Sequence, residues 1–481
     1  MREVKVTNTL TRTKEVLKPL TPGEIKIYAC GVTVYDHCHI GHAMQAIYFD
    51  AIRTYLEYIG YKVTYVRNFT DVDDKIIDRA QRDGISPLTL SANIIESSTE
   101  DMAALGVRPA DFEPKVSDTI PEIIAMTEDL IRNGFAYVSQ DGDVYYRVRH
   151  KKDYGKLSNQ SLDDMKSGSR SIHAGAKEDE LDFALWKKSD VEGATWPSPW
   201  GKGRPGWHIE CSAMSKKFLG AHFDIHGGGR DLVFPHHENE IAQSEAANGE
   251  KFANYWLHSG LLTINKQKMS KSLGNHILIK EFLKTWPVEV LRLAYLLQHY
   301  TSNTDFSQAV FQNCAKRLLY FYETLLLLDE YTGSAKVERP LPEMTEKFHA
   351  AMCDDFNTSK AIADMGIYFK AANEVIKKKK TPATAQEAAT LSKGFRELFN
   401  ILGLLKENPV DFINSLKDKI IVTLGITKKD VENFIAQRNE ARKNKDYALS
   451  DSLRSQLLEK GITLKDTATG TDWTVTFNIE G

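Results

Sequence analysis

The stretch IKIYACGVTVYDHCHIGH, residues 25–42, decides the fold of this chain. Its first six residues are apolar apart from one lysine, and they predict a β-strand. After a short turn, apolar residues recur at the spacing of one helix face. These positions are Ile40, Met44, Ile47, Ala51 and Tyr55. A strand that leads into a helix is the first half of a parallel-sheet unit with a crossover helix.

The same pattern follows directly along the chain. Gly60 is expected to end the helix, and residues 61–66 predict a second apolar strand. A second helix is expected from Asp71 onward, with Thr70 or Asp71 as its N-cap. Two strand–helix pairs in succession predict an α/β fold with a parallel sheet.

The sequence beyond this region predicts further domains. Residues 114–200 are polar with short strand-like runs, and we interpret them as an insertion. This insertion ends in a segment that is too rich in Pro and Gly for a helix. Helix periodicity over residues 308–330, 342–378 and 384–405 predicts a helical bundle. The predicted boundaries are 1–113 and 201–300 for the sheet domain, 114–200 for the insertion, 301–405 for the bundle, and 406–481 for a small mixed α/β domain.

Composition excludes several classes of protein. The 481 residues are 42% hydrophobic and 26% charged, as in a globular protein, and the net charge of −3 argues against non-specific coating of nucleic acid. Five scattered cysteines favour reduced thiols over a disulfide framework, and we assign no role to Cys38, Cys314 or Cys353. Without an N-terminal apolar signal or a membrane-length apolar run, we expect a cytoplasmic protein with no membrane partner. We expect a monomer because no interface signal stands out in the sequence.

Two motifs can handle phosphates. His39-Ile40-Gly41-His42 lies where the first strand turns into its helix, and a helix N-terminus favours anions. Gly41 leaves room for a flat ring against the backbone. Some 230 residues later, Lys268-Met269-Ser270-Lys271-Ser272 forms a doubly cationic polar loop that can stabilise developing phosphate charge. A structural His pair or a solvated basic loop is the alternative interpretation of each motif by itself.

A third constellation has the chemistry of a metal site. Two thiols, an imidazole and a carboxylate make a zinc donor set, and His236 and Glu240 share one helix face. The four candidate ligands are Cys30, Cys211, His236 and Glu240. Spacing alone is weak support, because no CxxC pair is present. Without the other motifs, two small core cysteines and a His–Glu pair on a helix surface are the favoured interpretation. His236-His237-Glu238 matches neither HExxH nor HxxEH, which argues against a metallohydrolase.

The HIGH motif at residues 39–42 and the KMSKS motif at residues 268–272 together resemble the class I aminoacyl-tRNA synthetases. This resemblance implies a Rossmann-type catalytic domain that joins an amino acid to AMP and then to the 3′ adenosine of a tRNA. It implies that His39, Gly41, His42 and Lys271 bind ATP. It also implies that Lys268 and Lys271 act with the two histidines in catalysis, and that Mg²⁺ accompanies ATP. Asp231 is a further candidate for contacts with adenosine or the amino acid.

Longer stretches resemble the cysteine-specific branch of that family. They are residues 28–36, 205–212 and 234–240, which read YACGVTVYD, PGWHIECS and FPHHENE. The resemblance implies one Zn²⁺ per chain on Cys30, Cys211, His236 and Glu240. It further implies a cysteine pocket lined by Gly31, Thr33, Thr70 and Trp207. Zinc binds thiolates well and neutral hydroxyls poorly, so coordination would separate cysteine from serine, which packing contacts separate poorly.

The last part of the chain resembles the family's anticodon-reading domain, which implies tRNA(Cys) as partner beside cysteine and ATP. Anticodon bases are read through hydrogen bonds to their edges, and Arg442, Asp451 and Asp466 are the candidates. An ordinary salt bridge is an equal alternative for each one. Two other functions remain open: an ATP-dependent ligase that joins cysteine to an amino sugar, and a non-catalytic zinc-dependent RNA-binding protein.

Overall fold

The structure is a computed structural model that describes residues 2–162, 165, 177–269, 274–333, 335, 337, 339–467 and 470–475. It divides into two compact units. The first comprises Met1–Leu261, Tyr300–Asn303 and Met352–Asn357, and the second comprises Leu262–His299, Thr304–Ala351 and Thr358–Gly481.

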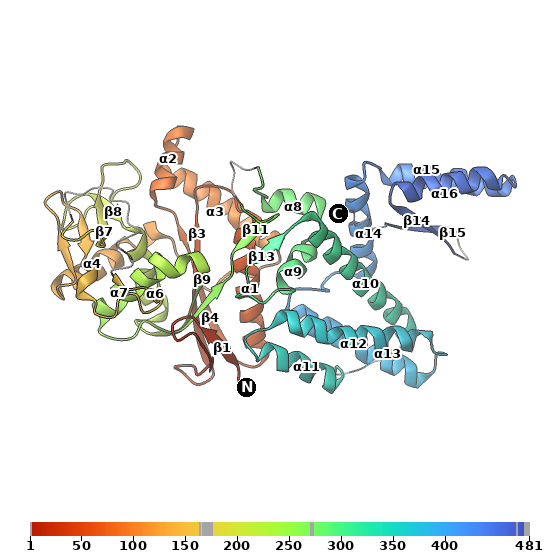
Figure 1. Cartoon of the computed structure of the whole chain (residues 1–481), viewed down its shortest axis with the longest axis horizontal. Helices are drawn as coiled ribbons and strands as arrows, with labels where there is room; N and C mark the ends of the chain where they lie inside the picture. The colour runs from red at the N-terminus through yellow and green to blue at the C-terminus, as the bar shows by residue number, and fades with distance from the viewer. Residues whose placement is uncertain are drawn as a thin grey trace. The chain divides into compact units, whose positions relative to one another are not determined.

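The first unit is built on a parallel sheet of four strands in the order β10-β9-β3-β4, of which Figure 1 labels β3, β4 and β9. These strands are β3 (Glu24–Thr33), β4 (Lys62–Thr70), β9 (Phe223–Gly229) and β10 (Ala253–Ser259). The helices of this unit are α1 (Ile40–Tyr58), α2 (Asp74–Asp83), α3 (Pro87–Ala104), α4 (Ile120–Arg132), α6 (Trp207–Leu219) and α7 (Glu238–Asn248). The predicted alternation of strand and helix is therefore present, and residues 25–42 supply most of β3 and the start of α1.

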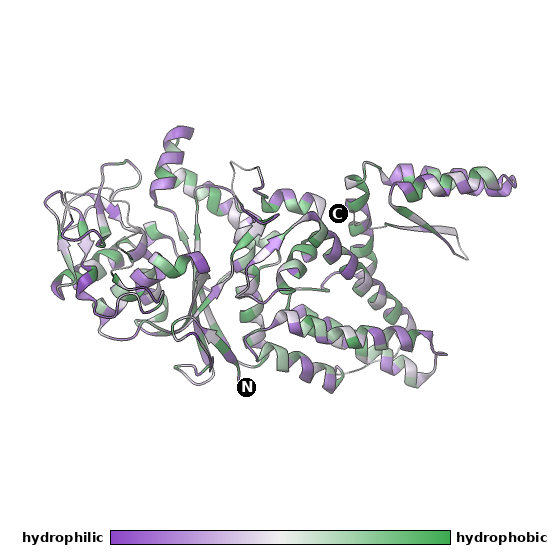
Figure 2. Cartoon of the chain, viewed as in Figure 1, coloured by the Kyte–Doolittle hydropathy of each residue, from purple (hydrophilic) through white to green (hydrophobic). Residues whose placement is uncertain are grey.

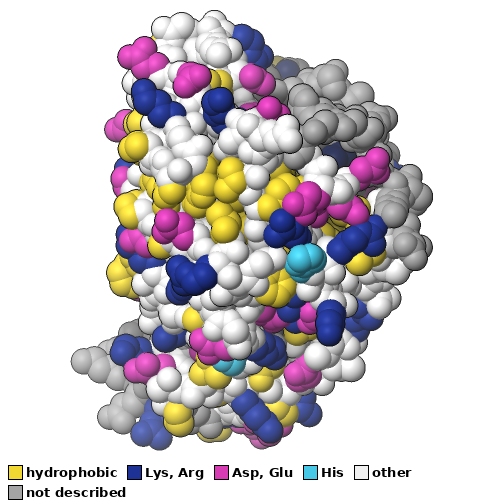
Figure 3. All heavy atoms as spheres, turned by 90° about the vertical axis from the view of Figure 1, so that its left-hand side faces the viewer, with side chains coloured by type: hydrophobic (Ala, Val, Ile, Leu, Met, Phe, Trp, Pro, Cys, Tyr) yellow, Lys and Arg dark blue, Asp and Glu magenta, His cyan; other side chains and the backbone are white. Residues whose placement is uncertain are grey.

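Two smaller sheets complete the first unit. A hairpin pairs β1 (Lys5–Asn8) with β2 (Thr13–Val16). The insertion carries an antiparallel sheet of β5 (Ala136–Val138), β6 (Val144–Tyr146), β7 (Phe183–Lys188) and β8 (Gly203–Pro205). Figure 3 shows basic and acidic side chains interspersed over the face on which this insertion lies, in keeping with the small net charge.

The expected N-cap of the second helix is wrong. Helix α2 begins at Asp74, and its N-cap is Asp73, whose side chain accepts a hydrogen bond from the Lys75 amide at 2.9 Å. Thr70 still belongs to β4. Asp71 is buried and accepts hydrogen bonds from the amide and hydroxyl of Ser117 at 3.0 and 2.5 Å. Its carboxylate is thus already engaged away from the helix, which is why it does not cap α2.

The second unit is mainly helical. Its helices are α8 (Ile279–Thr285), α9 (Val288–Leu296), α10 (Gln308–Thr332), α11 (Pro342–Met352), α12 (Thr358–Lys377), α13 (Pro382–Ile401), α14 (Pro409–Thr423), α15 (Lys428–Lys443) and α16 (Tyr447–Glu459). Its strands are β11 (Leu262–Ile264), β12 (Gln267–Lys268) and β13 (Thr304–Phe306), with a separate hairpin of β14 (Ile462–Thr467) and β15 (Gly470–Val475). Figure 2 shows apolar and polar residues on different faces of α10, α12 and α13, the pattern expected when helices pack on one another.

The helix periodicity predicted over residues 342–378 is interrupted. Asp355 and Phe356 have φ values of 68° and 50°, in the left-handed region that a helix cannot continue through. The Asp355 carboxylate accepts a hydrogen bond from the Thr7 amide at 2.7 Å, a tertiary contact that local periodicity does not reveal. Among the described residues, no helix is long and apolar enough to cross a membrane.

Candidate metal and nucleotide site

The candidate site lies where the strand order of the parallel sheet reverses. Strand β3 pairs with β4 on one side and with β9 on the other, so the chain leaves β3 in one direction and later returns on its other side. Ligands of open α/β sheets bind in the crevice at the carboxyl ends of strands at such a reversal. A register shift in β3 between Ala29 and Val32 lies beside Cys30, and irregularities of this kind re-aim side chains.

The structure brings the four predicted metal ligands together. Cys30 comes from β3, Cys211 from α6, His236 from the turn Val233–His237 before α7, and Glu240 from α7 itself. Their donor atoms all lie within 4.8 Å of one another, and all four residues are buried. The two sulfur atoms are 3.7 Å apart, and His236 Nε2 is 3.0 Å from Glu240 Oε1.

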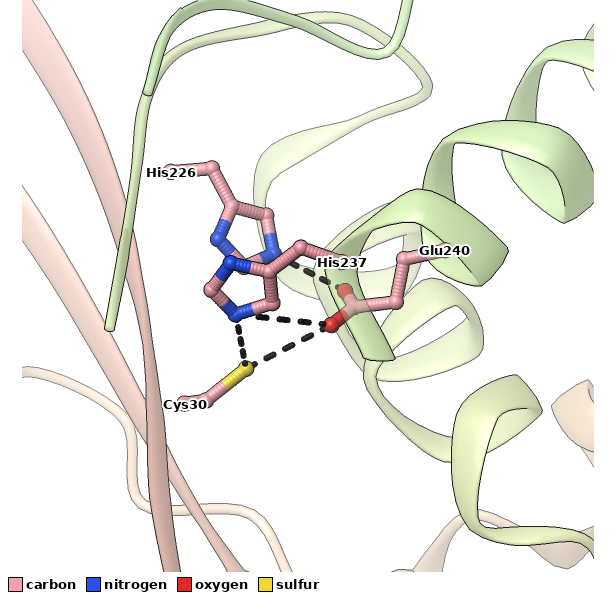
Figure 4. Close-up of side chains that lie close together, drawn as sticks. All are labelled: Cys30, His226, His237 and Glu240. Atoms are coloured by element: carbon pink, nitrogen blue, oxygen red, sulfur yellow. Dashed lines mark hydrogen bonds and ion pairs between the residues drawn. The ribbon is translucent and has the colours of Figure 1, made fainter. Parts of the chain in front are cut away.

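A second, overlapping donor set contains two histidines that the sequence analysis did not assign. Cys30, His226, His237 and Glu240 also lie within 4.8 Å of one another (Figure 4). His226 Nε2 is 2.8 Å from Glu240 Oε2, and His237 Nε2 is 3.3 Å from Cys30 Sγ. The signal for His226 was its place in the buried strand β9, opposite Tyr28 in the register of the sheet.

The electrostatics of this cluster favour a cation among its donors. A hydrogen bond from Cys30, against the effect of burial, lowers the pKa of Cys211 to about 6. Burial opposes charge on His236, but Glu240 and Cys211 raise the pKa of this imidazole to about 10. Burial likewise opposes charge on Glu240, yet His226 and His236 hold its pKa well below the usual range. Two anionic donors therefore stabilise one positive charge inside a buried cluster.

This donor set fits a zinc ion by its chemistry. Thiolate sulfur, imidazole nitrogen and carboxylate oxygen are the three ligand types that zinc takes in proteins. Metal-bound carboxylates and histidines are usually oriented by a further hydrogen bond. Glu240 has that partner in His226, and the Nδ1 of His236 has one in His208 Nδ1 at 3.0 Å.

Among the predicted cysteine-pocket residues, Trp207 contacts a residue of the cluster directly. Thr33 and Thr70 are register partners at the ends of β3 and β4. The Trp207 ring stacks on His236 with centroids 4.3 Å apart and keeps 38% of its surface exposed, so this side of the cluster is open to solvent. The Thr70 hydroxyl donates to Glu210 Oε2 at 3.4 Å, and burial raises the pKa of this unassigned carboxyl well above its usual value.

Gly31 is required by close backbone contact. A Cβ on this residue would lie 1.6 Å from the carbonyl oxygen of Asn68. The Gly31 amide donates to the Asn68 side-chain oxygen at 2.9 Å. The glycine thus allows β3 and β4 to approach next to Cys30, and a larger residue there would displace the strand that carries this thiol.

The predicted ATP-binding histidines start helix α1. His39 is the N-cap residue, and its ring stacks on His42 with centroids 3.7 Å apart. Both side chains are half-buried, as is Gly41. Gln45 on the same helix donates to the Cys30 carbonyl at 2.6 Å. The helix whose N-terminus is the predicted phosphate site is therefore tied directly to the strand that carries a candidate metal ligand.

The remaining nucleotide candidates occupy different parts of the structure. Asp231 is exposed in the 3₁₀ turn Arg230–Leu232 that follows β9. Lys268 is exposed in β12 of the second unit. Lys271 lies outside the described residues.

Comparison with known proteins decides the family. The class I tRNA synthetase (C) catalytic domain matches residues 16–316, and the DALR domain matches residues 347–406. The cysteine–tRNA ligase of Hahella chejuensis is 47% identical over 98% of this chain and 99% of its own length. The cysteine–tRNA ligase of Geobacter sulfurreducens is 46% identical with the same coverage. This chain belongs to the cysteine–tRNA ligase family.

Solved structures of other synthetases share the fold of this family member. Mycobacterium tuberculosis methionyl-tRNA synthetase in complex with methionyl-adenylate matches with a TM-score of 0.59 at 16% identity, over 84% of this chain and 94% of that one. The leucyl enzyme of Agrobacterium radiobacter, in its ternary complex, also gives 0.59, at 12% identity over 82% and 87%. The predicted fold class, a Rossmann-type α/β domain followed by helices, is confirmed.

The anticodon candidates that the family resemblance suggests lie on α15, α16 and β14. Asp466 accepts hydrogen bonds from both Arg438 and Arg442, with Arg442 Nη1 at 2.9 Å. Arg438, which was not among the candidates, is buried and binds the carboxylate through both terminal nitrogens. These contacts, led by Arg438, hold the pKa of Asp466 below its usual range. Asp451 is exposed on α16.

Proposed function

We propose that this chain is a cysteine–tRNA ligase that activates cysteine with ATP and transfers it to the 3′ adenosine of tRNA(Cys). The observation that carries the proposal is the buried donor cluster on β3, connected through Gln45 and Cys30 to the helix whose N-terminus bears His39 and His42. Such an arrangement suits a substrate that offers both a thiol and a carboxylate next to a nucleotide. Family membership supports the same conclusion.

We assign one zinc ion to Cys30, Cys211, His236 and Glu240. When bound, zinc supplies a thiophilic Lewis acid that favours a thiolate over a neutral hydroxyl. This set is preferred to the one with His226 and His237 because it contains both thiols, whose sulfur atoms lie 3.7 Å apart, and thiolates bind zinc well. The preferred set also lies beside the exposed ring of Trp207, where a substrate can enter.

The chain's own residues then position the reactants. The cysteine carboxylate attacks the α-phosphate of ATP, the bond to the β-phosphate breaks, and pyrophosphate leaves. Mg²⁺, when bound with ATP, would neutralise part of the phosphate charge. His39, His42 and the backbone around Gly41 bind phosphates at the start of α1. Lys268 and Lys271 stabilise the charge that develops on the transferred phosphate, which is commonly the largest catalytic contribution.

The second step needs no protein nucleophile. A ribose hydroxyl of the terminal adenosine attacks the acyl carbon, its proton passes to the leaving phosphate, and AMP leaves with the electron pair of the broken acyl–phosphate bond. Gly31, Thr33, Thr70 and Trp207 hold the aminoacyl group in the pocket, and Asp231 contacts adenosine or the amine. Positioning of this kind supplies most of the rate in group transfer between bound substrates.

We further propose that residues 406–481 read the anticodon through Arg442, Asp451 and Asp466. Residues 1–113 and 201–300 would form the catalytic domain, with 114–200 as its insertion and 301–405 as the bundle. The described α15, α16 and β14 place cationic and anionic side chains together, which suits recognition of base edges. The proposed state is a cytoplasmic monomer.

The test uses the purified full-length chain. We expect one zinc per chain by elemental analysis, cysteine-dependent exchange of pyrophosphate into ATP, and charging of tRNA(Cys), with serine inactive. Cys211→Ala should lose the metal and the preference for cysteine over serine. Cys38→Ala is the matched control, because both thiols are 2% exposed and lie in the same unit.

Each alternative outcome has a clear meaning. Exchange without charging of any tRNA would indicate the ligase that joins cysteine to an amino sugar. Binding of RNA with neither activity would indicate a non-catalytic zinc-dependent protein. An unchanged cysteine preference in Cys211→Ala would refute selection through the metal.

A further inference from the structure

The two thiols of the donor cluster form the one contact between cysteine sulfurs among the described residues. Cys30 Sγ and Cys211 Sγ lie 3.7 Å apart, and both are free thiols. Cys38 Sγ instead contacts a serine hydroxyl at 3.3 Å, and Cys353 Sγ contacts a tyrosine hydroxyl at 3.1 Å. All five cysteines belong to the part of the chain that the structure describes, so the fold offers one pair of thiols for bond formation within the chain.

Cys30 belongs to a segment of β3 that hydrogen bonds hold in place. The Gln45 side chain donates to the Cys30 carbonyl at 2.6 Å, and the Gly31 amide donates to the Asn68 side chain at 2.9 Å. A Cβ on Gly31 would lie 1.6 Å from the Asn68 carbonyl oxygen, so this part of β3 has no room to shift toward β4. The Cys30 sulfur therefore stays beside Cys211 with or without a metal ion in the cluster.

Cys211 shares a face of α6 with the residue at the solvent side of the cluster. Trp207 lies one helical turn before Cys211, and residues at this spacing share a helix face. The Trp207 ring stacks on His236 and is 38% exposed. The proposed function requires that the thiol of free cysteine reaches the metal. Hydrogen peroxide is smaller than cysteine, so a path that admits the substrate also admits this oxidant.

The other two donors keep their places without contacts from the thiols. Glu240 Oε2 lies 2.8 Å from His226 Nε2, and Glu238 on the same helix accepts hydrogen bonds from the amides of Leu157 and Ser158 at 3.1 and 2.8 Å. Glu238 is 1% exposed, so these hydrogen bonds are buried and anchor α7. Loss of both thiolates would therefore leave one imidazole and one carboxylate in place, which is half of a four-donor zinc set.

We propose that Cys30 and Cys211 form a reversible disulfide on exposure to peroxide, and that this bond releases the zinc and stops the activation of cysteine. This inference rests on the proposed function and concerns the regulation of that same site. A disulfide offers no thiolate, so two of the four ligands are lost together. The sulfur atoms move from 3.7 Å to a bond length of about 2.0 Å, a gap that rotation of the two side chains closes.

The oxidation takes place in two steps with hydrogen peroxide as the oxidant. The Cys211 thiolate attacks one peroxide oxygen, the O–O bond breaks, and the leaving hydroxide takes up a proton to become water. The product is a sulfenic acid on Cys211. The Cys30 thiolate then attacks this sulfur, the S–O bond breaks, and a second hydroxide leaves and is protonated to water. Two thiolates thereby give two electrons to one peroxide, and two protons are consumed.

The same oxidant also acts on the substrate. Free cysteine is a thiol, and peroxide converts thiols to disulfides by the same two steps. Oxidation of Cys30 and Cys211 would therefore stop the use of ATP under conditions in which the substrate itself is being oxidised. A reducing compartment keeps both thiols reduced, and exchange with a thiol reductant reverses the bond. The enzyme is active by default and is switched off by peroxide.

The test uses the zinc-loaded, full-length protein with a chromogenic zinc indicator. Hydrogen peroxide should release one zinc per chain, and mass spectrometry without reduction should find the peptides of Cys30 and Cys211 linked. Cysteine-dependent exchange of pyrophosphate into ATP should fall more than about tenfold, and dithiothreitol with added zinc should restore it to within about twofold. The metal-free protein should form the same link, and it should then take up no zinc until it is reduced.

Controls use the three cysteines outside the cluster. Cys38→Ala, Cys314→Ala and Cys353→Ala should each release zinc and form the linked peptide as the parent does. Cys353 is the most informative of the three, because it is the one cysteine of this chain that is not fully buried.

Two results would overturn the proposal. One is release of zinc while Cys30 and Cys211 stay unlinked, for example as separate sulfinic acids, and the other is a loss of exchange that depends on Cys353. A parent protein that binds no zinc would refute the metal assignment of the proposed function. Peptide mapping of that protein after peroxide treatment would still decide whether the two thiols form a bond.

Discussion

The sulfur atoms of Cys30 and Cys211 lie 3.7 Å apart although 181 positions separate the two residues in the chain. One thiol is fixed by a central strand of the parallel sheet and the other by the first turns of α6. No disulfide joins them, and Glu240 and His236 come from a third segment. Three separate elements are therefore arranged around one point, which is costly for buried polar groups unless a cation is bound there.

Removing the hydrogen-bond partner of a proposed metal ligand should lower the affinity for the metal, although all four proposed ligands remain. His226→Gln loses the contact of 2.8 Å that orients Glu240, so we expect zinc affinity to fall roughly 10- to 100-fold. Competition with a chelator measures this directly. His222→Gln is the control, because the ring of His222 hydrogen-bonds to Asn254 and not to a candidate metal ligand within the described part of the chain. Unchanged affinity in His226→Gln would mean that Glu240 is oriented by other groups.

Substitution of Gly31 should damage the sheet. In Gly31→Ala the new methyl group would overlap the Asn68 carbonyl, so we expect a loss of about 3 kcal/mol or more in the free energy of unfolding. Gly366→Ala, on α12 with no atom within 4 Å of the added carbon, should instead gain about 0.5–1 kcal/mol. Urea unfolding of both variants tests the contrast. Equal stabilities would contradict the close approach of β3 and β4.

A buried carboxyl on α9 should make stability depend on pH. Burial raises the pKa of Glu289 to about 7, against hydrogen bonds from Leu405, Tyr322 and Lys406. The pKa of Glu289 in the folded protein lies above the ordinary value of 4.5. The contribution of its protonated carboxyl to the free energy of unfolding is therefore complete below pH 4.5 and is lost as the pH rises through 7. The parent should lose about 3 kcal/mol relative to Glu289→Gln between pH 5 and 8.

This difference is measured by denaturant unfolding of both proteins across that range. Glu281→Gln, an exposed residue on α8, is the control and should follow the parent. A stability difference between parent and Glu289→Gln that stays constant with pH would show that Glu289 is ionised throughout.

Substitution of the two acidic anticodon candidates should affect protein stability and tRNA binding differently. Asp466→Asn breaks a paired contact with Arg438, so both stability and tRNA binding should fall. Asp451→Asn removes an exposed carboxylate and should raise the KM for tRNA about tenfold at unchanged stability. Charging assays and thermal unfolding measure the two effects, with the exposed Glu432→Gln as control. A normal KM in Asp451→Asn would remove it from the RNA interface.

Local patterns predicted the strand and helix around residues 25–58 because their apolar periodicity matches the structure. The four candidate metal ligands were predicted from the family resemblance, because no local sequence pattern connects Cys30 with Cys211. His226 and Arg438 were missed because their roles depend on partners far along the chain. The N-cap prediction for Asp71 was wrong for the same reason, because its carboxylate accepts a hydrogen bond from Ser117, which lies far along the chain.

Helix α7 carries two glutamates, two positions apart in the sequence, whose carboxylates have different contacts. Glu240 faces the donor cluster, while Glu238 secures the amides of Leu157 and Ser158. A transplant of the insertion from a distant relative must therefore bring amides that match Glu238. Without them the Glu238 carboxylate would be buried at the first turn of α7 with no hydrogen-bond donors, and the graft would disturb the proposed zinc site although it contains none of its ligands.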